Sequence, residues 1–319
     1  MEFNDMNIIK LINIRCLFVL LFIAGFIFPS CKKTPVYVWY VEPQYEKAWT
    51  RIIHDVTPPV NFKEIRVWDT SGVQAEIQAA SGILITSKPW KNNDKVSVYY
   101  NLTYDLEYNG AILIALDPWM VFRRSNSPIL NSERAYSPNK GDGILLLPGK
   151  DSSAVNAWIA RLLQSSPGQF PIDIKPWQDQ EMNLFSGSRF PDGAGTYTWQ
   201  DVFFKLMGNE TAWLYAPLSA IRRYPNPRKS ILDVSPFPEK PDSHEYSLQA
   251  SLLWALPLDS KDERIAETMK WLKKPETQTI IANAIDWIPA DPYGTPWDPA
   301  ALTAQRHWLT VPWVYDINQ

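Results

Sequence analysis

The sequence has few residues of the kinds that bind metals or carry redox chemistry. In 319 residues there are two cysteines, Cys16 and Cys31, and three histidines, His54, His244 and His307. No histidine has a partner at metal-ligand spacing, so we expect no metal site. The catalytic motifs of fixed spacing are also missing: there is no G-x-S-x-G elbow, phosphate loop, dinucleotide fingerprint or H-E-x-x-H pair. We therefore expect no cofactor and no enzymatic activity.

Charge is equally sparse, whereas aromatic residues are abundant. The formal net charge is −3 with 20% charged residues, and no basic stripe is present, so nucleic-acid binding is not expected. The chain contains 15 Trp, 14 Tyr and 13 Phe beside 27 Pro. Its length is sufficient for two domains that each bury a core.

The N-terminus has the features of an export signal. Lys10 and Arg15 precede an uncharged apolar run of 13 residues, 16–28. This run is shorter than the about 20 residues that span a bilayer, but it is typical of a signal-peptide core. Cys31 follows Ser30, an arrangement that resembles a bacterial lipoprotein cleavage site. We expect residues 1–30 to be removed and Cys31 to carry lipid, including palmitate, at the periplasmic side of the cell membrane; an uncleaved signal anchor is the alternative.

The first part of the mature chain is typical of an α/β domain. Strands are predicted at 36–41, 62–68 and 83–86, with a helix after Pro43 and a short helix after Thr70. This alternation predicts a parallel βαβ sheet. Strand periodicity continues over 95–108, and an apolar strand begins at 111 and runs to 122.

The middle of the chain is predicted to be mainly helical. Asp151 or Ser152 is expected to cap one helix, and Thr198 to start another that ends at Gly208. The segment 167–197, rich in Gly, Pro and polar residues, is expected to be a long surface connection. We predict a further helix over 209–224, interrupted at Pro217, and then a strand over 231–237.

The stretch 251–292 combines a strand with two helices. Residues 252–258 are apolar throughout, which favours a buried strand. Ser260 and Glu263 have the spacing of a capping box, and Pro275 suits the first position of a second helix. An apolar tail ends at Pro289.

This order of elements resembles the C-terminal part of the extracellular solute-binding proteins of sugar-type ABC importers, the maltose-binding-protein-like family 1. The resemblance implies an α/β, two-lobe periplasmic-binding-protein fold of type II, with a hinge and an interlobe cleft. Lobe 1 would comprise residues 31–116 and 253–292, and lobe 2 residues 117–252 and 293–319. In that family a strand with a "DP" segment crosses between the lobes, as Asp117 and Pro118 would here. The other matching residues are Ser260, Lys261, Pro275, Glu276, Gln278, Ile288 and Pro289.

Aromatic residues at strand ends suggest a sugar site. A sugar presents hydroxyls at its rim and C–H patches on its faces, so its site needs flat rings and polar groups. Ligands of open α/β sheets bind outside the carboxyl ends of the strands. The resemblance adds Trp213, which follows a Gly-Asn-Glu segment. The candidate ligand-binding residues are Trp39, Tyr40, Asp69, Asp117, Trp119, Trp213, Trp254 and Trp287.

The resemblance implies a lipid-anchored, monomeric solute-binding component of an ABC importer. It would capture a sugar or oligosaccharide by lobe closure and present it to the permease subunits. Replacing Trp213 or Asp117 by alanine is expected to weaken binding and leave the fold intact. Two alternatives stay open: a carbohydrate-active enzyme of glycosidase type, which needs two carboxylates across the cleft, and a lipoprotein that binds a protein or cell-wall partner.

Overall fold

The computed structural model describes most of the chain after residue 36. All of its described residues belong to the second of two units, Tyr37–Gln319. None of its described helices is both long and apolar enough to cross a membrane. The described segments are 37–62, 64–68, 81–87, 99–100, 107–108, 110–136, 143–162, 190–220, 232–239, 247–259, 261–310 and 313–316.

Several sequence predictions concern residues outside these segments. They are the signal peptide 1–30, the lipid on Cys31, the short helix after Thr70 and the ligand role of Asp69. They stay predictions.

The predicted parallel sheet is present at the start of the described chain. β1 (Val38–Val41) lies between β2 (Glu64–Val67) and β3 (Gly82–Thr86), and both neighbours run parallel to it. β1 and β3 are buried throughout, whereas β2 is mostly exposed at the sheet edge. Between β1 and β2 lie η1 (Pro43–Tyr45) and α2 (Glu46–Asp55). This is the βαβ arrangement that the apolar pattern predicted.

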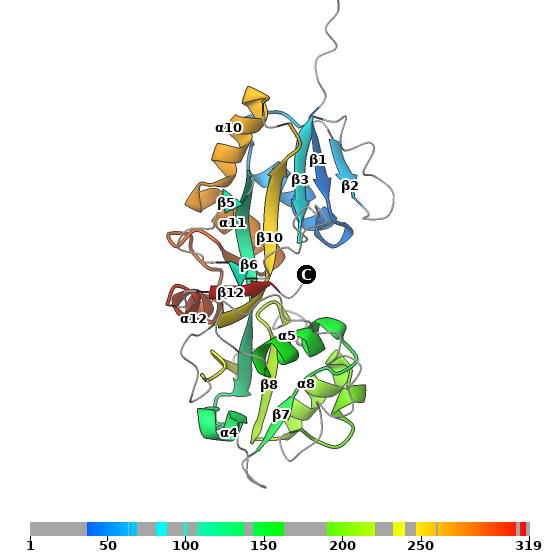
Figure 1. The fold of residues 1–319 in the computed structure, drawn as a ribbon, viewed down its shortest axis with the longest axis vertical. Helices are drawn as coiled ribbons and strands as arrows, with labels where there is room; N and C mark the ends of the chain where they lie inside the picture. Colours follow the sequence, from blue (N-terminus) through cyan, green and yellow to red (C-terminus); the bar gives the residue numbers. More distant parts are fainter. Residues whose placement is uncertain are drawn as a thin grey trace, which may run out of the picture. The chain divides into compact units, whose positions relative to one another are not determined.

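One long strand, β6, carries the chain between two sheets. β10 (Ser247–Pro257) lies between β3 and β6 (Ala111–Arg124), and β6 then continues into a second sheet (Figure 1). The partner of β6 changes from β10 to β8 (Ala212–Pro217) between Pro118 and Trp119. A single strand therefore belongs to both sheets.

The second sheet contains β7 (Ile144–Leu146), which runs parallel to β8, and β9 (Leu232–Ser235), which pairs with β6. The strand predicted over 231–237 is thus confirmed as β9. The helix predicted over 209–224 is wrong, because β8 occupies part of this range. Ala212–Ala216 are all buried in the sheet, where bulky and aromatic side chains pack well, so pairing with β6 overrides the helical pattern.

Three helices accompany this sheet, and two of their starts were predicted. They are α4 (Ser132–Tyr136), α5 (Ser152–Leu162) and α8 (Trp199–Gly208). Asp151 accepts a hydrogen bond from the Ser153 N–H at the start of α5. Thr198 caps α8 in a reciprocal capping box with Asp201. Within 167–197, the described part holds only the short η3 (Ala194–Thr196) as a regular element.

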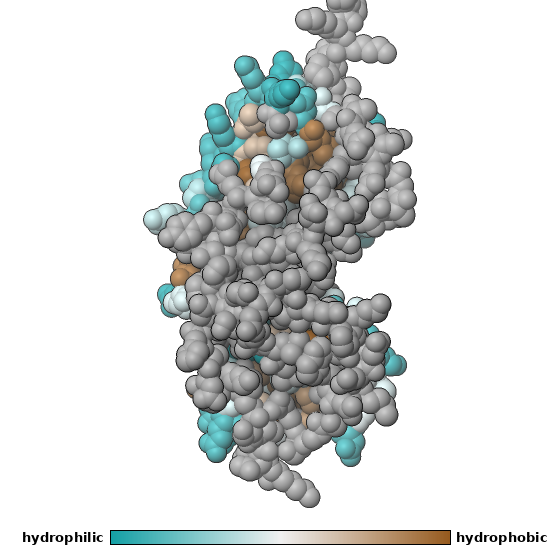
Figure 2. All heavy atoms as spheres, viewed as in Figure 1, coloured by the Kyte–Doolittle hydropathy of each residue, from teal (hydrophilic) through white to brown (hydrophobic). Residues whose placement is uncertain are grey.

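The C-terminal stretch agrees with the predicted strand and helices except at one cap. α10 (Glu263–Leu272) is capped by Asp262, which accepts hydrogen bonds from two backbone N–H groups of the first turn. The cap assigned to Ser260 is therefore wrong: the carboxylate next to the helix satisfies its free donors. α11 (Pro275–Ile285) begins at the predicted proline. The exposed face of α10 is hydrophilic (Figure 2).

The remaining elements complete the sheets. β11 (Ile288–Pro289) pairs with β6, and β12 (Trp313–Asp316) runs parallel to the start of β10. α12 (Pro299–Trp308) lies between them in the sequence. Of the extended stretch predicted over 95–108, the structure describes only β4 (Tyr99–Tyr100) and β5 (Glu107–Tyr108), which pair with β12 and β6.

A buried polar network ties α5 to the strands. The Arg161 guanidinium donates to the carbonyl oxygens of Phe237 and Pro238 at 3.1 and 3.0 Å. It also donates to Gln249 Oε1 on β10, which accepts a second hydrogen bond from the Tyr215 hydroxyl on β8. Removing one partner of such a network leaves other buried groups unsatisfied, so it holds α5 in one position.

Near this network, His307 in α12 gives the protein a testable acid sensitivity. Burial, and secondarily the charge of Arg161, lower the pKa of His307 to about 4. In the unfolded chain a histidine has a pKa near 6.5, so between pH 6.5 and 4 the unfolded state binds a proton that the folded state does not. The free energy of unfolding should therefore fall as the pH drops through this window. We expect His307→Gln to reduce that dependence by about 1.4 kcal/mol per pH unit inside the window.

Urea unfolding of both proteins between pH 7.5 and 4 measures this difference. Subtracting one curve from the other removes the contributions common to both proteins and isolates that of His307. If the free energies of unfolding of the two proteins change with pH in parallel, His307 has the same pKa in the folded and unfolded states and the prediction is wrong.

Candidate functional site

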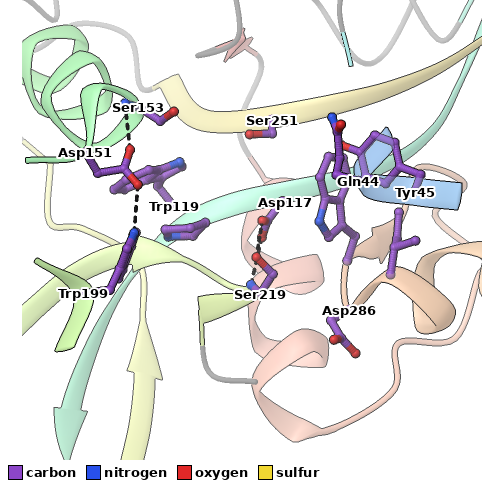
Figure 3. A pocket seen from close by; sticks show the side chains of 13 residues that line it. Gln44, Tyr45, Asp117, Trp119, Asp151, Ser153, Trp199, Ser219, Ser251 and Asp286 are labelled. Carbon is purple, nitrogen blue, oxygen red and sulfur yellow. Dashed lines mark hydrogen bonds between the residues drawn. The ribbon is translucent and has the colours of Figure 1, made fainter. Parts of the chain in front are cut away.

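A pocket of about 410 Å³ lies where β6 changes sheets (Figure 3). Its volume is within the range of small-molecule binding sites. Its lining comes from segments far apart in the sequence. Figure 3 shows Gln44, Tyr45 and Asp286 on one wall, Trp119, Asp151, Ser153 and Trp199 on the other, and Asp117, Ser219 and Ser251 between them. The lining also includes Trp287, whose ring contacts that of Tyr45, its neighbour Ile285, and Pro217, the register partner of Trp119.

The first wall presents two aromatic rings at a right angle. Tyr45 ends η1 directly after β1, and Trp287 follows α11. Their ring centroids are 5.7 Å apart with an interplanar angle of 89°. Burial is the main cause that raises the pKa of Tyr45, with the Glu42 charge adding to it. Tyr45 therefore stays a neutral phenol that can donate or accept a hydrogen bond.

A buried carboxylate positions Gln44 on the same wall. Glu42 accepts hydrogen bonds from the backbone N–H and the hydroxyl of Ser87, both at 2.8 Å, and from the Thr86 hydroxyl. It also accepts from the Gln44 side-chain amide. Because a carboxylate only accepts, the Gln44 nitrogen must face Glu42, which leaves the Gln44 oxygen as an acceptor. The ends of β1 and β3 thus fix one polar group of the pocket.

The second wall is built around Asp151. One carboxylate oxygen accepts from the Ser153 N–H at 2.9 Å, and the other accepts from the Trp199 indole N–H at 2.8 Å. A Cβ atom on Gly149 would lie 2.5 Å from the Ala194 carbonyl oxygen, so only glycine allows this loop to approach η3. The start of α5 thereby fixes the Trp199 ring at the pocket.

Asp117 organises the region between the walls. It is buried, and its two carboxylate oxygens accept from the backbone N–H and the hydroxyl of Ser219 at 2.9 and 2.6 Å. Its register partner on β10 is Ser251. Two hydroxyl groups therefore lie beside the point where β6 changes partners.

The charged residues of the described lining are all acidic: Asp117, Asp151 and Asp286. On the same lining, the Trp119 indole N–H is buried and has no hydrogen-bond partner among the described residues. A solute with hydroxyl groups could donate hydrogen bonds to the carboxylates. Carboxylate or phosphate groups on a solute would be repelled.

The sequence-predicted site residues divide into two groups. Asp117, Trp119 and Trp287 line the pocket. Trp39, Tyr40, Trp213 and Trp254 are at most 2% exposed, belong to hydrophobic clusters and are not part of this lining.

The buried tryptophans have clear packing roles. Trp39 stacks on Phe62 with a centroid distance of 4.2 Å and meets Trp49 edge-on. Trp213 donates its indole N–H to the Pro128 carbonyl oxygen at 2.8 Å. Trp39 and Trp213 therefore have structural roles, each in one of the two sheets.

Sequence reasoning missed several lining residues, chief among them Tyr45, Asp151, Trp199 and Asp286. The sequence contained an indication of Asp151 and Trp199, because both lie at predicted helix starts. Free backbone N–H groups at a helix start can bind a side chain and fix its position. Tyr45 falls within the helix predicted after Pro43. No group of three or more potential metal ligands occurs among the residues that the structure describes.

Asp286 has an unusual backbone conformation. It is the one non-glycine residue with positive φ in the described segments, at φ 65° and ψ 29°. For an L-residue this left-handed conformation costs roughly 1–2 kcal/mol. The Trp287 N–H donates to the Ala282 carbonyl oxygen at 2.9 Å, a bond typical of the Schellman ending of a helix.

Comparison with known proteins gives a structural match without a sequence match. No family model matches the chain, and no curated protein does. Among solved structures, the bacterial solute receptor AcbH, described as exclusively preferring β-D-galactopyranose, matches with a TM-score of 0.61 and 11% identity over 89% of this chain and 88% of AcbH.

Two further receptors match over similar lengths. RafE of Streptococcus pneumoniae has a TM-score of 0.58 and 10% identity, with 90% of each chain covered. A probable secreted solute-binding lipoprotein of Streptomyces coelicolor has a TM-score of 0.53 and 14% identity, with 86% of this chain and 87% of that one covered. The fold implied by the sequence motifs is thus confirmed: the chain has the α/β, two-lobe fold of these solute-binding proteins.

Proposed function

We propose that this protein binds a sugar or oligosaccharide outside the cytoplasm and delivers it to an ABC importer. The observation that supports this most is the pocket, in which aromatic rings stand on both walls with hydrogen-bonding groups between them (Figure 3). Tyr45 and Trp287 would pack against one side of the solute, and Trp119 and Trp199 against the other. Flat rings suit the C–H faces of a sugar, and the aspartates and serines suit its hydroxyls.

We further propose that the two lobes comprise residues 31–116 with 253–292, and 117–252 with 293–319. The change of β6 partner between Pro118 and Trp119 lies two residues after the proposed boundary and supports a division in this part of β6. With these boundaries the two walls belong to different lobes. A solute that contacts both walls would favour the closed state over the open one.

Attachment to the membrane and transfer to permease subunits belong to the same proposal. They are supported by the signal-peptide pattern, by the cysteine at residue 31 and by the description of the Streptomyces coelicolor neighbour as a lipoprotein. Globomycin blocks lipoprotein signal cleavage, so treated cells should accumulate the precursor. Normal processing in treated cells would contradict lipidation of Cys31.

Thermal-shift and calorimetric titration with D-galactose, maltose, raffinose and ribitol tests the solute-binding function. At least one neutral solute should raise Tm, since a ligand at 100 times its Kd stabilises the folded state by about 2.7 kcal/mol. D-Galacturonate should give no shift, because the charged residues of the lining are acidic. If none of the neutral solutes binds, the proposed function is wrong.

The three aspartates also raise the alternative of a glycosidase. Such an enzyme needs a carboxylic acid that donates a proton to the leaving group. Asp117 and Asp151 instead use both carboxylate oxygens to accept hydrogen bonds from the protein. We therefore expect no hydrolysis of aryl glycosides or of raffinose and maltose; turnover that depends on these aspartates would favour the enzyme.

A further inference from the structure

The end of α11 departs from the rules that other helices of this protein follow. Each of the other described α-helices has a basic residue in its last turn, which suits the negative end of the helix dipole. The last turn of α11 has none, and an aspartate follows it. The chain thus places a negative charge where the helix itself disfavours one.

The backbone at the same residue is also unfavourable for aspartate. Asp286 occupies the left-handed position that ends the helix, where glycine is the usual residue because it has no Cβ. Glycine or asparagine would satisfy the same turn at lower cost. Two independent local preferences therefore oppose aspartate at this position.

Asp286 lies at the pocket. It lines the pocket and directly precedes Trp287, whose ring forms part of the same wall. Strained non-glycine residues concentrate at active sites and ligand clamps.

We propose that Asp286 is a specificity-determining ligand-binding residue, whose carboxylate accepts hydrogen bonds from hydroxyl groups of the bound solute. This inference rests on the proposed solute-binding function. Asp117 and Asp151 shape the pocket by binding Ser219, Ser153 and Trp199. The charge of Asp286 contributes to the rejection of anionic sugars.

Two substitutions at this position separate a binding role from a structural one. Asp286→Gly removes the backbone strain, and Asp286→Asn removes the charge while keeping a residue that tolerates this conformation. Both variants should therefore unfold at the same Tm as the wild type or at a higher one. For the neutral solute that binds the wild type most tightly in the panel above, Kd should rise by about tenfold or more in both.

The anionic solute gives a second readout. Asp286→Asn should reduce the preference for D-galactose over D-galacturonate, because a repelling charge has been removed. Asp55→Asn is a matched control: Asp55 also carries a carboxylate at the end of a helix, and it does not belong to the described lining. It should leave Kd unchanged.

The outcomes are distinct. A lower Tm for Asp286→Gly would show that the aspartate supports the fold, and an unchanged Kd in Asp286→Asn would show that the carboxylate does not bind the solute; either overturns the inference. If the wild type binds no solute of the panel, the proposed function is wrong, and this inference, which depends on it, is wrong as well. Circular dichroism of each variant confirms that affinity is measured on folded protein.

Discussion

Trp199→Ala is expected to raise the Kd of the bound sugar by about 30-fold. Trp199 is only partly buried, and its ring stands at the second wall of the pocket, fixed at its N–H by Asp151 and flanked by Phe203 at 5.9 Å. Removing a tryptophan that anchors a ligand typically costs about 2 kcal/mol or more, and 1.4 kcal/mol corresponds to a factor of ten. Isothermal titration calorimetry with the solute identified in the panel measures this change.

Two variants control this experiment. Trp199→Phe keeps a flat ring but cannot donate to Asp151, so its Kd should lie between those of the wild type and the alanine variant. Trp271→Ala removes a partly buried tryptophan from α10, which contributes no residue to the described lining. It should bind as the wild type does. An unchanged Kd in folded Trp199→Ala would exclude this ring from the site.

Trp213→Ala is expected to lower the free energy of unfolding by about 3–5 kcal/mol, the usual cost of deleting a large buried aromatic side chain. Trp213 is 2% exposed and packs in the cluster that contains Trp158 and Tyr215. Its ring also fills the space beside Gly143, where a Cβ atom would come within 2.4 Å of the indole. The substitution should leave a cavity and deprive the Pro128 carbonyl of its donor.

Urea unfolding measures this loss, and Trp213→Phe, which refills most of the cavity, should recover a large part of it. The structure therefore changes the result expected from sequence, in which the alanine variant kept its fold and lost affinity. If Trp213→Ala unfolds within about 1 kcal/mol of the wild type yet binds weakly, Trp213 belongs to the site after all.

The parts of the fold that local chemistry determines could be predicted from the sequence. Thr198 and Asp151 were assigned to helix starts because their side chains can accept hydrogen bonds from the free backbone N–H groups of the first turn. Pro275 was assigned to a helix start because it has no backbone N–H that would need a partner there. β8 could not be predicted in this way. Its strand state depends on pairing with β6, about 90 residues earlier in the chain, and no local pattern contains that information.

The site was predicted only in part, for a geometric reason. Strand ends do point toward the pocket, but β1 ends at Val41, so the residues that reach the pocket are Gln44 and Tyr45 and not Trp39. Elements pack against both faces of this sheet, which buries Trp39 and Tyr40 in different hydrophobic clusters. Asp117 was found because it lies at the crossover itself.

The position of β10 also determines the order in which the protein can fold. β3 and β6 do not pair with each other. β10, residues 247–257, lies between them and pairs with both. A nascent chain that ends before residue 247 therefore has two unpaired strand edges where the finished sheet has none. These pairings join residues far apart in the sequence, which slows folding. β3 and β6 thus gain their shared partner only after about four fifths of the chain has been synthesised, and until then both edges are available to other strands.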